Sequence, residues 1–104
     1  MKELSVTERN KIGLYIAKLI SADKEKAIKD VAVASWSIGT AYLRVYIIFR
    51  PNTVLPEDIT TIIDNWAYEG ITGTDTKLTI STEYADEYLP KDLTYLYKDR
   101  KPIT

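Results

Sequence analysis

The stretch from residue 31 to residue 49 constrains the fold of this chain more than any other feature. Apolar side chains alternate along much of it, and Gly39-Thr40 interrupts the run near its middle. Such a pattern is typical of two antiparallel strands joined by a tight turn. Glycine at the first central position predicts a type II′ turn, which pairs Ala34 with Val45. The chain is therefore expected to contain a β-hairpin at its centre.

This pairing sorts the hairpin into two faces, because side chains alternate along a strand. The face expected to meet the helices carries Ala32, Ala34, Leu43, Val45, Ile47 and Phe49. The opposite, outer face carries Val31, Val33, Tyr42, Arg44, Tyr46 and Ile48. Aliphatic residues beside tyrosines and an arginine predict a contact surface there.

Two helices and a third strand accompany the hairpin. Ser5 and Glu8 form a capping-box pattern before a helical apolar stripe, and Pro56 stands at the expected first position of a second helix that Gly70 ends. Residues 77–84 alternate as a strand. The element order αββαβ predicts an α+β two-layer sandwich. It resembles a ferredoxin-like fold that lacks its first strand.

Residues 85–104 fit two patterns. Leu89, Leu93 and Leu96 have the spacing of a helix that starts near Pro90, whereas alternation from Leu93 through Tyr95 fits a strand. The favoured interpretation is a short helix or an extended arm. We therefore expect a single α+β domain at 1–84 and a C-terminal tail at 85–104 that packs on the sheet or on a partner.

Composition excludes much common chemistry. The chain has 104 residues, neither cysteine nor histidine, and a net charge of −1. Disulfides, thiol nucleophiles and imidazole bases are therefore impossible. No catalytic, cofactor or metal site is predicted, although Glu83, Asp86 and Glu87 could hold Mg²⁺ or Ca²⁺ weakly if they lie on one helical turn. The polar N-terminus and the lack of a long apolar run predict a cytoplasmic protein without membrane contact.

The outer face alone is small for an interface. Three strands of this length present on the order of 330 Å², below the ~800 Å² per partner of a standard interface. We therefore expect the tail to fold over this face or a second copy to add to it. The predicted partner-binding residues are Val31, Val33, Tyr42, Arg44, Tyr46, Ile48, Tyr95 and Tyr97.

The resulting expectation is a small non-enzymatic protein-binding or self-association module. A homodimer is its favoured form, and a viral or mobile-element accessory protein is a role that would suit its size. Single-stranded nucleic-acid binding by the tyrosines and arginines is the alternative, since aromatic rings stack on bases and cations contact phosphates. An enzyme that uses carboxylates and a hard metal ion is the second alternative.

Overall fold

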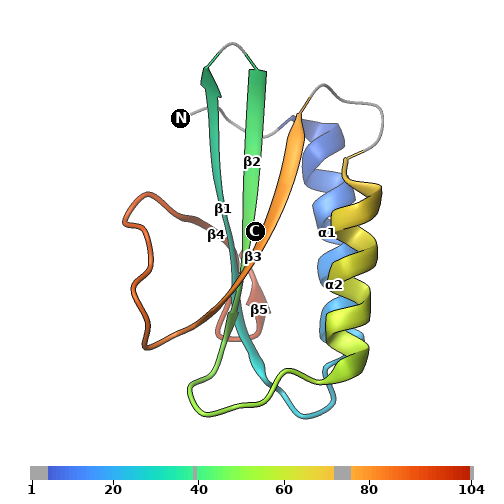
Figure 1. The fold of residues 1–104 in the computed structure, drawn as a ribbon, viewed down its shortest axis with the longest axis vertical. Helices are drawn as coiled ribbons and strands as arrows, with labels where there is room; N and C mark the ends of the chain where they lie inside the picture. Colours follow the sequence, from blue (N-terminus) through green and yellow to red (C-terminus); the bar gives the residue numbers. More distant parts are fainter. Residues whose placement is uncertain (1–4, 39, 72–75, 104) are drawn as a thin grey trace.

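Two helices cover one side of a five-stranded mixed sheet. The computed structural model of the chain describes residues 5–38, 40–71 and 76–103. In chain order the elements are α1 (Val6–Ala22), β1 (Ile28–Ile38), β2 (Thr40–Phe49), α2 (Glu57–Glu69), β3 (Lys77–Tyr84), β4 (Thr94–Lys98) and β5 (Lys101–Pro102). The strand order is β3-β2-β1-β4-β5, and Figure 1 places both helices on one side with residues 85–93 on the other. The predicted α+β two-layer architecture is confirmed, whereas the finer ferredoxin-like assignment is not.

The start of α1 follows the predicted capping box. The Ser5 hydroxyl accepts a hydrogen bond from the Glu8 N–H at 3.1 Å, and the Glu8 carboxylate accepts one from the Ser5 N–H at 3.3 Å. These bonds satisfy donors that the first turn of a helix leaves without partners. Ile12 and Leu19 are fully buried against the sheet. The apolar stripe therefore orients α1 as expected.

The second helix packs against the first through aromatic rings. Pro56 is the N-cap of α2, one residue before the predicted position, and Gly70 ends the helix with a φ of 65°. The rings of Tyr15 and Trp66 stack with centroids 5.0 Å apart. In the described parts of the chain, neither helix has the length and apolar character needed to cross a membrane.

The register of the central hairpin differs from the predicted one by a single residue. Val33 pairs with Val45 and Ala34 with Arg44, so the predicted pairing of Ala34 with Val45 is wrong. Since faces alternate at every residue, this shift moves Val31 and Val33 to the helix side. The observed register buries β-branched residues of both strands against the helices. Gly39 of the predicted turn lies outside the described residues.

The C-terminal residues add two strands to the sheet. β4 pairs antiparallel with β1 and brings Tyr97 opposite Val31. Of the two favoured forms of the tail, the short helix from Pro90 is therefore wrong, and the alternating pattern through Tyr95 is the one adopted. Residues 85–93 connect β3 to β4 across the far side of the sheet (Figure 1). The predicted division between 1–84 and 85–104 stays a prediction.

Candidate functional site

The predicted outer surface is partly covered by the chain itself. Ile48 is fully buried and Tyr46 is 8% exposed. Both belong to a second apolar cluster that is separate from the main core. The covering side chains come from the C-terminal segment and are Ala85, Leu89, Leu93 and Tyr95. A single chain thus supplies the contacts that a partner was expected to make at this part of the sheet.

The eight predicted partner-binding residues do not form one surface. Val31 and Val33 belong to the main core under the helices, and Tyr97 joins them there. Their placement on the outer face was wrong, because it followed from the one-residue register error and from the assumed form of the tail. Tyr42, Arg44, Tyr46, Ile48 and Tyr95 share the outer side.

Arg44 lies on the outer face beside the second apolar cluster, of which it is not a member. Its side chain is half-buried, and its Nε is shielded from solvent without a hydrogen-bond partner. The neighbouring Tyr42 ring lies 5.9 Å from the Nζ of Lys77 on β3. A buried donor without an acceptor costs about 1–3 kcal/mol, so the position of Arg44 requires an explanation.

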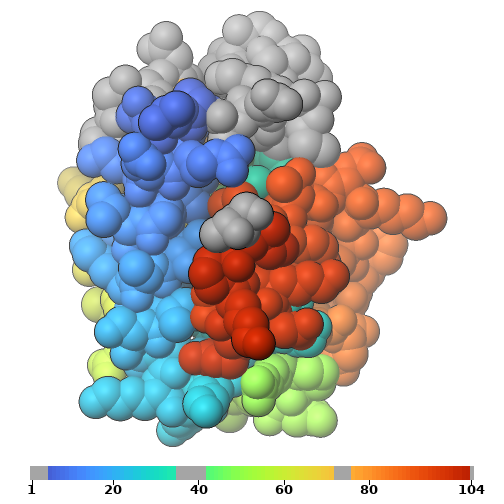
Figure 2. Space-filling view, turned by 180° about the vertical axis from the view of Figure 1, so that it is seen from behind, coloured from blue at the N-terminus to red at the C-terminus, as the bar shows by residue number. Residues whose placement is uncertain are grey.

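A pocket that sequence reasoning missed lies between α1 and the β4–β5 hairpin. It is partly open to solvent and has a volume of about 500 Å³. In Figure 2 the C-terminal residues lie directly beside α1. The residues that line this hairpin pocket are Arg9, Gly13, Ile16, Ala17, Ile20, Ser21, Leu96, Tyr97, Pro102 and Ile103.

The wall formed by α1 follows from helical spacing. Lining residues recur every three or four positions between Arg9 and Ser21, which spans about 18 Å of helix. Gly13 has no side chain and Ala17 has a small one, so the middle of this stripe leaves space for a ligand. A Cβ added at Gly13 would meet no atom within 4 Å. The small residues were visible in the sequence. The opposite wall was not, because it depends on where the C-terminal strands lie.

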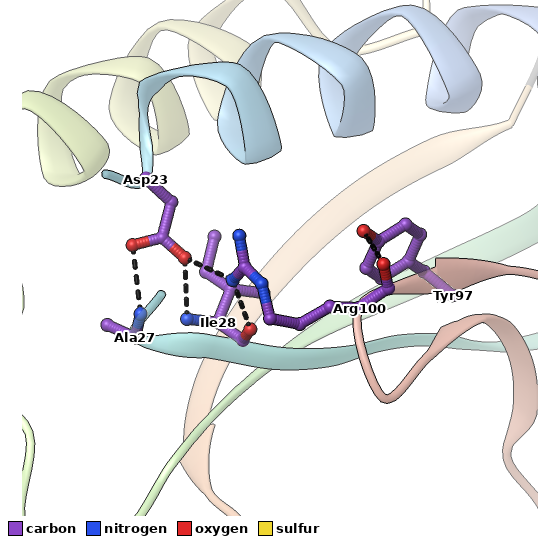
Figure 3. Close-up of polar contacts among 5 residues, drawn as sticks. All are labelled: Asp23, Ala27, Ile28, Tyr97 and Arg100. Carbon is purple, nitrogen blue, oxygen red and sulfur yellow. Dashed lines mark hydrogen bonds and ion pairs between the residues drawn. The ribbon is translucent and has the colours of Figure 1, made fainter. Parts of the chain in front are cut away.

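The hairpin is fastened to the end of α1 by a buried ion pair (Figure 3). The Arg100 Nη1 lies 2.8 Å from the Asp23 Oδ2 and donates to the Ile28 carbonyl at 2.7 Å. Asp23 also accepts from the N–H groups of Ala27 and Ile28, at 3.0 and 2.8 Å. Each oxygen of this buried carboxylate therefore has a donor. These contacts fix one wall of the hairpin pocket relative to the other.

Electrostatics favour the charged form of Asp23. Burial acts to raise the pKa of this carboxyl, but hydrogen bonds from Ile28, Arg100 and Ala27 outweigh it and lower the pKa below the ordinary value. The turn that presents Arg100 is itself unusual, since Asp99 and Arg100 have φ angles of 50° and 66°. Two such residues match a type I′ hairpin turn, which favours Asn-Gly. The hydrogen bonds of Arg100 offset this backbone strain.

Sequence reasoning missed this ion pair because 77 positions separate its members. Asp23 is the C-cap residue of α1, and an aspartate can bond to nearby backbone N–H groups, so its own neighbourhood held a local signal. Nothing local marked Arg100. A hydrogen bond from the Tyr97 hydroxyl to the Arg100 carbonyl further ties the turn to β4.

The acidic residues near the end of β3 do not gather into a metal site. No group of three metal-ligating Asp or Glu side chains occurs within residues 5–38, 40–71 and 76–103. Asp86 and Glu87 are exposed and line a shallow polar hollow with Asn52, Thr53 and Tyr84. The proposed weak Mg²⁺ or Ca²⁺ site at Glu83, Asp86 and Glu87 therefore gains no support.

Comparison with known proteins gives one distant structural neighbour. No protein-family model matches the chain, and a search of curated proteins finds no match. A solved structure from Sulfolobus solfataricus, named a "putative nucleotidyltransferase", is similar over 100% of this chain and 97% of its own. The TM-score is 0.48 and the sequence identity is 10%. At these values the likeness transfers no activity to this chain.

The expectation of a non-enzymatic binding module on the outer face is corrected by the fold itself. The surface on which that module depended is covered in part by residues 85–95, and Val31, Val33 and Tyr97 of its predicted residues lie in the main core. The single-stranded nucleic-acid alternative used the same face, on which Tyr42, Arg44 and Tyr46 do lie together, and it stays a prediction. The homodimer and the viral accessory role also stay predictions.

Proposed function

We propose that this chain binds a small amphipathic organic acid in the hairpin pocket. The volume of about 500 Å³ carries the proposal, because ligand sites in proteins commonly enclose ~300–1,000 Å³. Such sites combine an apolar lining with a few polar groups that orient the ligand. The hairpin pocket has this character, since aliphatic side chains from α1 and the C-terminal strands form most of its wall.

The apolar wall favours an alkyl or aryl group of the ligand. Ile16 and Ile20 approach from the helix, while Leu96 and Ile103 approach from the hairpin. Ile103 is 51% exposed, so a ligand in the pocket would remove apolar surface of the protein from water. Burial of apolar area contributes roughly 25 cal/mol per Å². Most of the affinity is therefore expected from this part of the ligand.

Arg9 favours an acid over a neutral ligand. It lines the pocket at one end of the α1 stripe, and among the described residues its guanidinium forms no ion pair. A guanidinium can hold a carboxylate through two parallel hydrogen bonds. Because Arg9 is exposed, the pair would add at most about fivefold in affinity. Its main effect would be to orient the carboxylate toward the N-terminal end of α1.

Titration calorimetry and amide NMR with decanoate as the probe would test the proposal. We expect saturable binding, with shifted amide signals in α1 and β4. Ala17→Phe should fill the pocket and abolish binding. Ala67→Phe makes the same change at an exposed alanine of α2 away from the pocket, and it should leave binding intact. Equal binding by both variants, or no binding by the unmodified chain, would contradict the proposal.

A second comparison tests the role of Arg9. Decanoate should bind more tightly than decanol to the unmodified chain, and Arg9→Gln should remove that preference while leaving decanol affinity unchanged. If Arg9→Gln weakens the binding of decanoate and of decanol equally, the side chain acts through packing and not through its charge.

A further inference from the structure

Arg44 on the outer face has one buried donor atom without an acceptor. Its Nε is buried and unpartnered, and within the described parts of the chain its guanidinium takes part in no ion pair or hydrogen bond. Buried donors in native proteins are almost always paired with protein, water or a bound ion. The guanidinium cannot lose its charge, and its terminal nitrogens, which are not buried as Nε is, can reach an external acceptor.

The neighbouring strand supplies further donors beside Arg44. β3 runs parallel to β2, with Thr79 opposite Arg44 and Ser81 opposite Tyr46. Lys77 stands opposite Tyr42, and its Nζ lies over the ring of that tyrosine. Residues two apart on a strand point to the same face, about 7 Å from one another. The ammonium and two hydroxyls of β3 are thus on the face that carries the guanidinium.

Among the described residues, the charges beside Arg44 are positive and have no acidic partner. The first carboxylate of β3, Glu83, stands opposite Ile48 at the other end of the strand pair. Asp86, Glu87 and Asp92 of the covering segment form no ion pair with Arg44 or Lys77 among the described residues. Two cations held on one face without an acid between them favour the binding of an anion.

We propose that Arg44, Lys77, Thr79 and Ser81 bind a small phosphate oxyanion, either free or as the phosphate of a monoester. A phosphate presents several acceptor oxygens in a tetrahedral arrangement and carries up to two charges, which suits two cations and two hydroxyl donors. A carboxylate would satisfy fewer of these donors. This anion site rests on different residues from the hairpin pocket, which lies on the helix side, so either proposal can fail alone.

Inorganic phosphate is the probe for the first test, at low ionic strength because salt screens exposed charges. Amide NMR should show saturable shifts at Thr79 and Ser81, and phosphate should raise the melting temperature. Arg44→Gln should weaken phosphate binding by about tenfold or more. The matched control is Arg50→Gln, since Arg50 is an exposed arginine just after the end of the same strand, and it should change little.

Lys77→Gln keeps the test decisive if Arg44→Gln does not fold. Lys77 is exposed, so its replacement should leave the fold intact while it weakens phosphate binding several-fold. Shifts that grow linearly without saturation, or that are equal in Arg44→Gln and Arg50→Gln, would overturn the proposal. Binding of a single-stranded oligonucleotide without binding of phosphate would overturn it as well. Decanoate binding should be unaffected by either substitution.

Discussion

The two faces of the sheet are closed by different means. On the helix side, α1 and α2 bury a continuous core that includes Phe49 and Trp66. On the outer side, residues 85–95 cover only part of the sheet with a smaller cluster around Tyr46 and Ile48. Regular helices present a broad apolar stripe, whereas an irregular segment offers a few side chains. The difference explains why the outer face keeps an open polar region around Arg44.

The faces also differ in how the C-terminal residues attach. The segment at 85–93 covers the outer face through apolar contacts, and its backbone hydrogen bonds from Ala85 to Phe49 and from Glu87 to Tyr84 lie at its start. The β4–β5 hairpin is fixed to the end of α1 on the helix side by the Asp23–Arg100 ion pair, and its turn is held to β1 because the Asp30 carboxylate accepts from the Asp99 N–H at 2.9 Å. We therefore expect the helix side to be rigid and sensitive to charge, and the outer side to be more adaptable.

The largest effect is expected for Ile47→Ala. Ile47 is fully buried on the helix side. Its truncation leaves a cavity that the two helices and the sheet cannot move to fill. The free energy of unfolding should fall by about 4 kcal/mol, within the range for aliphatic truncation in a core. Urea denaturation followed by circular dichroism would measure it.

Ile48→Ala makes the same change one residue further along and on the opposite face. Ile48 is also fully buried, but its cover is the irregular segment, which can collapse onto the smaller side chain. The expected loss is about 2 kcal/mol. Equal losses for the two variants would remove the proposed difference in rigidity. Limited proteolysis should cut residues 85–93 faster in Ile48→Ala than in Ile47→Ala at matched stability.

Acid should weaken the helix-side attachment first. Because hydrogen bonds from Ile28, Arg100 and Ala27 lower the pKa of Asp23 in the folded chain, its contribution is present above the unfolded pKa of about 4. That contribution is lost as the pH falls through the lower, folded pKa. Asp23→Asn should therefore have a shallower loss of stability between pH 5 and pH 2 than the unmodified chain.

Asp92→Asn is the control for this pH dependence. Asp92 is exposed in the segment on the outer side, so its replacement should leave the slope of stability against pH nearly unchanged. Urea midpoints measured across the acid range would compare the three chains. A slope in Asp23→Asn equal to that of the unmodified chain would show that other groups control acid unfolding.

The smallest effect is expected for Gly13→Ala on the helix side. Space is open beside Gly13, and its backbone conformation suits alanine. The substitution should raise stability by about 0.4–1 kcal/mol through helix propensity and a less flexible unfolded chain. Gly70→Ala also has open space but a φ of 65°, so it should destabilise. Thermal melts of the pair would isolate the backbone effect, and a loss in Gly13→Ala would contradict it.

Local signals predicted the helices well. The capping box at Ser5 and the stop at Gly70 depend on residues within one turn, and both occur as expected. The alternation from residue 31 to residue 49 likewise predicted the hairpin. The register was wrong because it was derived from an assumed turn at Gly39, while burial of Val31 and Val33 decided the pairing.

The candidate sites were less predictable than the fold. Arg44 could be singled out on its strand, but its unpaired Nε depends on what the C-terminal segment leaves uncovered. The hairpin pocket combines α1 with residues near the end of the chain, and no local pattern relates Arg9 to Ile103. Contacts between segments so distant in sequence have no short-range signature.

By itself, the sequence determined the order of most elements, the inward faces of both helices and the absence of thiol and imidazole chemistry. These follow from side-chain periodicity and composition, which act within a few residues. Only the tertiary structure decided the hairpin register, the path of residues 85–95 and the join of Asp23 to Arg100. These three features share one physical reason. Each depends on which apolar or charged groups, far apart in the sequence, are buried against one another in the folded chain.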